Sequence, residues 1–247
     1  MTDPTTATTA IARDPSLAVQ VAWACRILAS QGYEDLTLGH VSVLTPDGVM
    51  YIKRKGVALS EVTPEDVLVF PVHANLADAP ADMHLEAVLH TEVYKRRPDV
   101  RCVIHGHPLY ATAFGATEAR LETLTHDAVL FTDRISTYEG VPDLITGDEQ
   151  GKEVAEALGG GTVILLRNHG VLVAERDTPW AVLTAVLLEK AAQLQFVASA
   201  FGPLRPIPSG LVESIHARKY QSGFPDEYWD AWIRALRRAG HDEGMPS

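Results

Sequence analysis

The sequence contains little cysteine and no apolar run long enough to cross a membrane. Its two cysteines, Cys25 and Cys102, fall in a predicted helix and a predicted buried strand. Two buried thiols in a chain of 247 residues are typical of a reducing compartment, so we expect a cytoplasmic protein. The longest apolar runs, such as residues 181–188, fall well short of the roughly 20 residues that a membrane-spanning helix needs, so we expect no membrane partner.

The sequence is also short of positive charge. Lys and Arg total 21 against 32 Asp and Glu, which gives a formal net charge of −11. Proteins that bind nucleic acid through its phosphates show a basic excess or a basic stripe, so we expect no nucleic-acid partner. The one dense basic cluster is Lys53-Arg54-Lys55. It is either a local site for a small anion or a solvated strand edge, where lysines discourage pairing with another sheet.

An interdomain linker rich in Gly, Ser or Pro is absent between Asp14 and about Gly202. We therefore predict one domain over residues 14–202, with 46% hydrophobic residues in the chain to supply its core. Residues 1–13 are rich in Thr and Ala and lack the basic and apolar segments of a signal peptide, so they predict a disordered tail. Residues 203–247 predict a C-terminal extension that packs on this domain or on a neighbouring subunit.

Capping and turn signals predict the elements of this domain. Asp14 and Pro15 are typical of an N-cap and a first helical residue, and Gly32 of a helix end. The turn Pro46-Asp47-Gly48 separates two predicted strands, residues 41–45 and 49–53. Further helices are predicted at residues 84–97, 108–115, 147–158 and 178–200, with a last helical segment that carries Tyr220, Tyr228, Trp229 and Trp232, and further strands at residues 67–70, 100–105, 162–167 and 171–174.

Several of these strands are joined by tight turns, which parallel crossovers cannot use. The predicted fold class is therefore α/β: a single three-layer domain with a central, mainly antiparallel or mixed sheet flanked by helices.

The most specific motif is Ile104-His105-Gly106-His107-Pro108, at the end of a predicted strand. Residues i and i+2 of a strand share a face, so the two imidazoles can converge, with Gly106 leaving room between them. The end of a strand is also a usual place for the active site of an α/β protein. The motif predicts two metal ligands or, alternatively, two surface histidines that flank a turn.

A second motif, Asn168-His169-Gly170, also follows a predicted strand. Gly170 permits a sharp turn that would present His169 to a cleft. A histidine beside a glycine is by itself more often a turn residue than a ligand. Together with His105 and His107, however, it supplies a third nitrogen ligand and leaves open positions, which is typical of a catalytic metal site.

A carboxylate, Glu86, is predicted near the start of a helix, one turn before His90. A glutamate is favoured there by the helix dipole, which is also its ordinary structural role. Beside a metal, the same carboxylate is a candidate for proton transfer.

In this order, the motifs resemble the class II aldolase/adducin family over residues 19–201. The matching segments are Gly39-His40-Val41-Ser42, Ile52-Lys53 with Gly56, residues 63–67, Glu86 with His90 and Tyr94, Arg97-Pro98-Asp99, His105 with His107, and Asn168-His169-Gly170. The family contains sugar-phosphate aldolases and epimerases, a dehydratase, decarboxylases and the non-enzymatic adducin heads.

The resemblance implies a site and an assembly. It makes His105, His107 and His169 the ligands of one divalent metal per subunit, with Zn, Mn, Fe and Co all open. It makes Glu86 the acid/base, which in the resting site can also coordinate the metal. It further implies a homotetramer with active sites between subunits, to which Tyr220 is a candidate contribution from the neighbour, as is the stretch of residues 125–127.

The sequence departs from the sugar-phosphate members where they bind phosphate. In place of a Gly-Asn-x-Ser loop, a Ser-Gly pair and a Ser-Ser pair, it carries His40, Lys55-Gly56 and His84. These side chains suit a planar carboxylate or phenolate better than a phosphate. His40 in this loop is similar to members that decarboxylate hydroxyaromatic acids. We therefore predict that His40, Lys55, Gly56 and His84 bind a small-molecule carboxylate.

The predicted function is a divalent-metal-dependent carbon–carbon lyase acting on a non-phosphorylated, carboxylate-bearing substrate. We favour decarboxylation of a hydroxyaromatic acid, in which the metal stabilises an enolate or phenolate and Glu86 exchanges the proton. One alternative is an aldolase that cleaves a hydroxy-oxo acid or a sugar phosphate. Others are an adducin-like interaction module without metal and an Fe(II) oxygenase, since three histidines also suit Fe(II).

Overall fold

The structure, a computed structural model, describes residues 13–246 of the chain, so the predicted tail, residues 1–13, lies outside it except for Arg13. The helices are α1 (Pro15–Leu28), α2 (Ala87–Arg96), α3 (Leu109–Gly115), α4 (Asp148–Leu158), α5 (Thr178–Ser199), α6 (Ser209–Lys219) and α7 (Phe224–Arg238). The strands are β1 (His40–Leu44), β2 (Val49–Lys53), β3 (Val67–Pro71), β4 (Cys102–Gly106), β5 (Ile135–Tyr138), β6 (Val163–Leu166) and β7 (Gly170–Glu175).

The described strands form one seven-stranded sheet in the order β3-β2-β1-β4-β7-β6-β5. Every neighbouring pair is antiparallel except β5 and β6, which are parallel and are connected through α4. The predicted mixed, mainly antiparallel sheet is therefore confirmed. Strand β4 lies at its centre and pairs with β1 on one side and β7 on the other.

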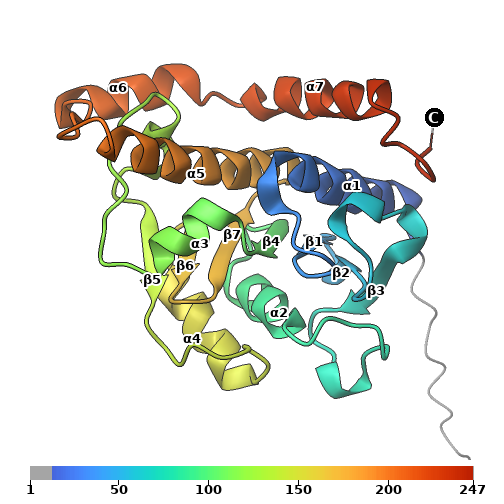
Figure 1. Cartoon of the computed structure of the whole chain (residues 1–247). Coiled ribbons are helices and arrows are strands. Elements are labelled where there is room, and N and C mark those ends of the chain that lie inside the picture. The colour runs from blue at the N-terminus through green and yellow to red at the C-terminus, as the bar shows by residue number, and fades with distance from the viewer. Residues whose placement is uncertain (1–12, 247) are drawn as a thin grey trace, which may run out of the picture.

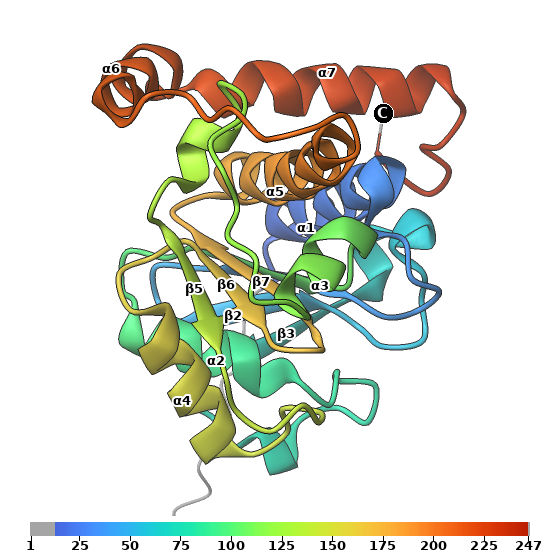
Figure 2. The ribbon, with the colours of Figure 1, turned by 60° about the vertical axis from the view of Figure 1, so that its left-hand side comes forward.

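Helices cover both faces of the sheet, as Figure 2 shows. Cys102 and Ile104 of β4 pack with α1, α3 and α5, whereas Val103 between them packs with α2 and α4. This alternation follows from the two-residue period of a strand and gives two apolar cores, one on each face. The predicted three-layer architecture is thus confirmed.

The C-terminal segment adds a further layer of helix. Figure 1 shows α6 and α7 lying across α5 and α1, on the side away from the sheet. Trp229 and Trp232 of α7 are partly buried against the core beneath them. The end of the segment is held by buried Arg26 of α1, which donates hydrogen bonds to the carbonyls of His241 at 2.8 Å and Glu243 at 2.7 Å.

Helix α5 is long and apolar enough, by length and composition alone, to cross a membrane, with a mean hydropathy of 1.4. However, 67% of its most apolar window is buried inside the protein. It lies between the sheet, α1, α3 and α7, so its apolar character is that of a core helix.

Helix α2 begins later than its sequence indicates. The prediction placed its start at residue 84, but the first helical residue is Ala87, and Glu86 precedes the helix as an uncapped N-cap residue. Residues 80–86 instead form turns tied to the loop that follows β2, where the Lys55 N–H donates to the carbonyl of Asp82 at 2.8 Å. Glu86 therefore lies outside the helix, and the direction of its side chain is not set by helical geometry.

Candidate metal centre

Strand register brings histidines together on the α2 side of the sheet. His105 follows Val103 by two residues and therefore shares its face. His40 of β1 is the cross-strand partner of His105, and the two ring centroids are 5.0 Å apart. His107, two residues further on and just beyond β4, has its ring centroid 4.9 Å from that of His105.

The third predicted ligand comes from the turn between β6 and β7. His169 donates its backbone N–H to Leu166 at 3.0 Å, and the turn is made by Asn168, which adopts a left-handed φ of 56°. The prediction assigned the sharp turn to Gly170, but Asn168, a residue that tolerates this conformation, makes it. Gly170 instead lets the turn pack closely against β4 and His107: a Cβ there would lie 2.5 Å from Cδ2 of His107 and 2.6 Å from the Gly106 carbonyl.

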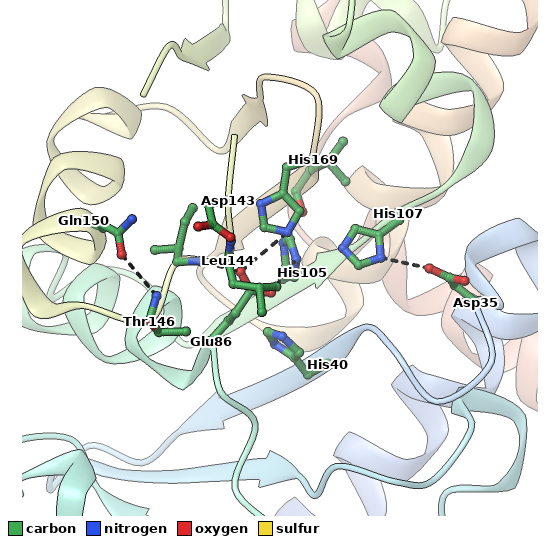
Figure 3. A network of polar contacts seen from close by, with 12 residues as sticks. Asp35, His40, Glu86, His105, His107, Asp143, Leu144, Thr146, Gln150 and His169 are labelled. Carbon is green, nitrogen blue, oxygen red and sulfur yellow. Dashed lines mark hydrogen bonds and ion pairs between the residues drawn. The ribbon is translucent and has the colours of Figure 1, made fainter. Parts of the chain in front are cut away.

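His105, His107 and His169 converge as predicted. One ring nitrogen of each lies within 4.8 Å of the others, an arrangement visible in Figure 3. Nδ1 of His105 contacts the Val171 carbonyl at 3.0 Å, and Nδ1 of His107 contacts Asp35 at 2.9 Å. Because those partners are a carbonyl and a carboxylate, which accept hydrogen bonds, both rings carry a proton on Nδ1, and in the neutral imidazole that leaves Nε2 bare.

The bare nitrogens are the clearest sign of a metal site. Nε2 of His105 and Nε2 of His107 are buried without a hydrogen-bond partner among the described residues. An unpaired buried nitrogen is costly, and a metal ion would satisfy it. The contact from Nδ1 to a carbonyl or carboxylate is also the usual way that proteins orient metal-binding imidazoles. The donor set therefore fits a divalent cation.

Glu86 lies beside these rings, as Figure 3 shows. Its carboxylate is 3.6 Å from Nε2 of His105 and 3.5 Å from Nε2 of His169, and it accepts a hydrogen bond from the Ile145 N–H at 2.8 Å. Burial acts to raise the pKa of Glu86, but the hydrogen bond with His169, the electrostatic interaction with the nearby His105 ring and the hydrogen bond from the Ile145 N–H lower it to about 2. The resting group is an ionised carboxylate.

A pocket of about 210 Å³ opens next to this cluster. Its lining includes four of the residues predicted to bind substrate, namely His40, Lys55, Gly56 and His84. The rest of the lining comes from Glu86, His107, the leucines Leu38, Leu85 and Leu144, and Thr37 and Gly39. Tyr220, also predicted for this site, does not line the pocket. It is buried at the end of α6, where its hydroxyl donates to the carbonyls of His126 and Asp127 at 3.2 Å.

The basic cluster divides into three different environments. Lys53 is fully buried, and its ammonium group donates to the Thr37 carbonyl at 3.1 Å and to Nε2 of His84 at 3.3 Å. Arg54 pairs with Asp66 at 2.9 Å, whereas Lys55 is exposed at the pocket. A solvated edge therefore does not describe Lys53, which supports His84 from behind the pocket.

Two residues of the site, Asp35 and Lys53, were not identified from the sequence. Asp35 is 72 residues from His107, its partner, and lies in the irregular segment that follows α1. No local pattern marks such a pairing, because only the assembled sheet brings the two segments together. For Lys53 the signal was present as a basic cluster, but its burial could not be read from composition.

The fold and the site together define a class: three-layer α/β proteins that collect three imidazoles and a carboxylate at the ends of central strands. A family model for the class II aldolase and adducin N-terminal domain matches residues 19–196. The chain therefore belongs to the class II aldolase and adducin family, as its motifs indicated.

Two curated relatives are similar over much of the chain. The 4-hydroxy-3-prenylphenylpyruvate oxygenase/4-hydroxy-3-prenylbenzoate synthase of Streptomyces roseochromogenus is 32% identical over 61% of this chain and 55% of its own length. The 3,4-dihydroxyphthalate decarboxylase of Arthrobacter keyseri is 29% identical over 76% of this chain and 81% of its own length. The chain thus spans little more than half of the first relative.

Solved structures agree on the fold. An aldolase II superfamily protein from Pseudomonas syringae has 25% identity and a TM-score of 0.79, with 92% of this chain and 94% of that chain covered. The L-fuculose-1-phosphate aldolase of Thermus thermophilus has 28% identity and a TM-score of 0.66, with 78% and 100% covered. The prediction of a lyase agrees with these relatives, which include decarboxylases and aldolases.

Proposed function

We propose that this chain is a cytoplasmic, divalent-metal-dependent carbon–carbon lyase that acts on a non-phosphorylated, carboxylate-bearing substrate, and that it decarboxylates a hydroxyaromatic acid. The observation that carries the proposal is the pair of bare, buried Nε2 atoms on His105 and His107, next to His169 and the ionised Glu86. The similarity to a dihydroxyphthalate decarboxylase supports the choice of reaction.

His105, His107 and His169 would hold the metal. A divalent cation there supplies a Lewis acid that stabilises negative charge on a substrate oxygen. The residues themselves fix its place, since the Val171 carbonyl and Asp35 hold the rings of His105 and His107 by their Nδ1 protons. Imidazole ligands suit Zn, Fe and Co and, less selectively, Mn, so all four belong in the first activity tests.

The pocket suits a small acid with an apolar body. Lys55 supplies an exposed cation at its wall, and Leu38, Leu85 and Leu144 supply apolar surface. A Lys ammonium pairs with a carboxylate by charge, and the leucines exclude water from a ring. Gly56, beside Lys55, has a φ of 81° and no atom near its missing Cβ, so the loop leaves space for the substrate.

Glu86 would carry the proton. An ionised carboxylate has no proton to give, so it first takes the proton of the substrate hydroxyl. The bond between the ring carbon and the carboxylate then breaks, CO₂ leaves, and the electron pair stays on the ring. Glu86 returns its proton to that carbon, and the phenolate product regains a proton from water. The Ile145 N–H holds the carboxylate in place throughout.

The test is turnover of defined acids by protein loaded in turn with Zn, Mn, Fe and Co. Hydroxylated aromatic acids, with 3,4-dihydroxyphthalate among them, should release CO₂, whereas L-fuculose 1-phosphate should not be cleaved. Removal of the metal with a chelator should abolish CO₂ release, and its return should restore it. Cleavage of the sugar phosphate without any decarboxylation would contradict the proposal and would favour aldolase activity, for which the Thermus thermophilus relative provides the precedent.

An Fe(II) oxygenase is the other candidate that an observation favours, because the Streptomyces roseochromogenus relative carries oxygenase in its name. Three imidazoles with open positions suit Fe(II). An oxygen electrode separates the two reactions: consumption of O₂ together with substrate indicates an oxygenase, and CO₂ release without O₂ consumption indicates a decarboxylase.

The proposed assembly is a homotetramer whose active sites lie between subunits. Exposed apolar side chains lie at the pocket and next to Asp35 in the chain, with exposed fractions of 64% for Leu85, 51% for Leu144 and 81% for Leu36. Apolar surface gathered around one site is typical of a contact surface. The family resemblance makes Tyr220 a candidate for the site of a neighbouring subunit, although within its own chain Tyr220 is buried and its hydroxyl donates to backbone carbonyls.

A further inference from the structure

A chain of buried hydrogen bonds leads from the pocket into the core beneath β1. It begins at His40 on the pocket wall, whose Nδ1 lies 2.6 Å from Nε2 of His90. Nδ1 of His90 lies 2.6 Å from Oγ of Ser42, which in turn lies 2.7 Å from the hydroxyl of Tyr94. The Tyr94 hydroxyl donates to the backbone carbonyl of Ser42 at 3.0 Å, where the chain ends.

The carbonyl at the end fixes the direction of every bond. A carbonyl oxygen only accepts, so the single hydrogen of Tyr94 goes to it. The phenol oxygen must then accept from the Ser42 hydroxyl. Because Ser42 donates its only hydroxyl hydrogen to Tyr94, its oxygen must accept a hydrogen bond from Nδ1 of His90. The reverse order would leave two oxygens 3.0 Å apart with no hydrogen between them, a costly arrangement in a buried place.

The same reasoning continues through the two rings. Both rings are buried, and among the described residues no carboxylate forms a hydrogen bond with either, so each is a neutral imidazole with one proton. His90 holds its proton on Nδ1 and therefore offers a bare Nε2 to His40. His40 must hold its proton on Nδ1 to meet it. Nε2 of His40 is left bare, and no hydrogen bond within the described residues engages it.

The other imidazole rings of the pocket do not offer a free acceptor nitrogen to a substrate. Nε2 of His84 already accepts from the buried ammonium group of Lys53, which can only donate. Nε2 of His105 and of His107 face the position proposed for the metal. His40 also lies close enough to Glu86 and His105 to form a metal-binding group with them, but when His105, His107 and His169 hold the metal, its Nε2 keeps a free acceptor, since no described residue donates a hydrogen bond to it.

The geometry points to a recognition role for this acceptor: Nε2 of His40, held bare by the chain that ends at Tyr94, selects a substrate that places a hydroxyl donor against it. This inference rests on the proposed function and sharpens it, because the substrate must carry a free hydroxyl and not an ether at that position. His90, Ser42 and Tyr94 are positioning residues, which act through His40 and do not touch the substrate.

Neutron diffraction of the Zn-loaded protein exchanged into D₂O tests the direction of the chain without any ligand. The expected result is deuterium on Nδ1 of His40 and Nδ1 of His90, with none on Nε2 of His40. Deuterium on Nε2 of His40 would overturn the inference. Zn bonded to that nitrogen would overturn it equally, because the lone pair would then be unavailable to a substrate.

Calorimetry tests the recognition. The probes are 3,4-dihydroxybenzoate and its two monomethyl ethers, titrated into Zn-loaded wild type, Tyr94→Phe and Tyr33→Phe. Tyr33 is the matched control, since it is a buried tyrosine whose hydroxyl also donates to a backbone carbonyl, that of Ala185 at 2.8 Å. Phenylalanine at position 94 removes the fixed end, so the chain can reverse and His40 can donate to an ether oxygen.

The quantity compared is the affinity ratio of each ether to the parent acid within one variant, so that a loss of folded protein cancels. One ether should bind roughly tenfold more weakly than its parent in wild type and Tyr33→Phe, the size of one hydrogen bond, and this penalty should shrink several-fold in Tyr94→Phe. Equal ratios in all three proteins would overturn the inference. A bare Nε2 in a protein that decarboxylates no hydroxy acid would instead count against the proposed function alone.

Discussion

His107 is the predicted ligand that the fold needs least. It lies just beyond the end of β4 and its side chain is 18% exposed, whereas His105 is buried within the central strand. His107→Ala should therefore remove most of the bound metal and the activity while the protein stays folded. Elemental analysis and circular dichroism of the purified variant measure the two outcomes.

The matched control for this change is His73→Ala, which removes an exposed histidine from the segment after β3. It should keep the full metal content. A His107→Ala protein that also keeps it would show that the ligands have been assigned wrongly.

Glu86 can be separated from the ligands by a change that keeps its size. Glu86→Gln still accepts from the Ile145 N–H but cannot take up a proton. We expect metal to be retained and turnover to fall at least about a hundredfold. Glu92→Gln, on the same side of the sheet and buried in a pair with Lys95, is the control and should turn over normally. Near-normal turnover by Glu86→Gln would remove this residue from the mechanism.

Lys55 tests whether the substrate carries a carboxylate. If the ammonium group holds that carboxylate equally in the ground and transition states, Lys55→Ala should raise KM and leave kcat unchanged. The expected loss is about 1–3 kcal/mol, as for a hydrogen bond to a charged group. Lys190→Ala, an exposed lysine of α5, is the control. A KM unaffected by Lys55→Ala would make Lys55 a solvated edge residue.

At the scale of elements, the turn between β6 and β7 depends on the missing side chain of Gly170. A Cβ there would meet the ring of His107 and the carbonyl of Gly106, and the latter belongs to β4 and cannot move without disturbing that strand. Gly170→Ala should therefore lower both the free energy of unfolding and the metal content, measured by urea denaturation and elemental analysis. Gly160→Ala, where no atom lies within 4 Å of the added Cβ, should do neither. An unchanged metal content in Gly170→Ala would show that the turn can adapt.

Elements with strong local signals were predicted well. The hairpin of β1 and β2 follows from a Pro-Asp-Gly turn between apolar strands, and α1 from its Asp-Pro start. Strand β5, by contrast, was missed: its four residues include Ser136 and Thr137, and it is defined by parallel pairing with β6, which a local pattern cannot reveal. Helix α6 was missed for a related reason, since its residues show no clear apolar stripe.

The residue types and their spacing in the sequence were enough to predict the ligands and Glu86. His105 and His107 follow from strand periodicity, and His169 and Glu86 from their place in the family motifs. The contacts that orient those side chains were not predictable. Asp35 approaches His107, and His90 approaches His40, only after distant segments have packed together.

At the scale of the whole molecule, the proposed homotetramer would bury the exposed leucines near the metal centre. Light scattering during size-exclusion chromatography should give four times the mass of one chain. Leu36→Glu places a charge on the most exposed of these leucines and should shift the protein towards smaller species. Leu211→Glu, on α6 and 51% exposed, is the control and should leave the assembly intact. A wild-type protein that elutes as a monomer would contradict the proposed tetramer.

The predicted metal ligands lie on elements that differ in how firmly hydrogen bonds hold them, and this difference affects the rate at which the metal dissociates. His105 belongs to β4, which is bonded to strands on both sides, so its amide should exchange with solvent hydrogen only when the whole sheet unfolds. His169 belongs to a three-residue turn, whose opening breaks few hydrogen bonds. Dissociation of the metal should therefore begin at the turn, and its rate should follow the local opening of that turn and not the stability of the sheet.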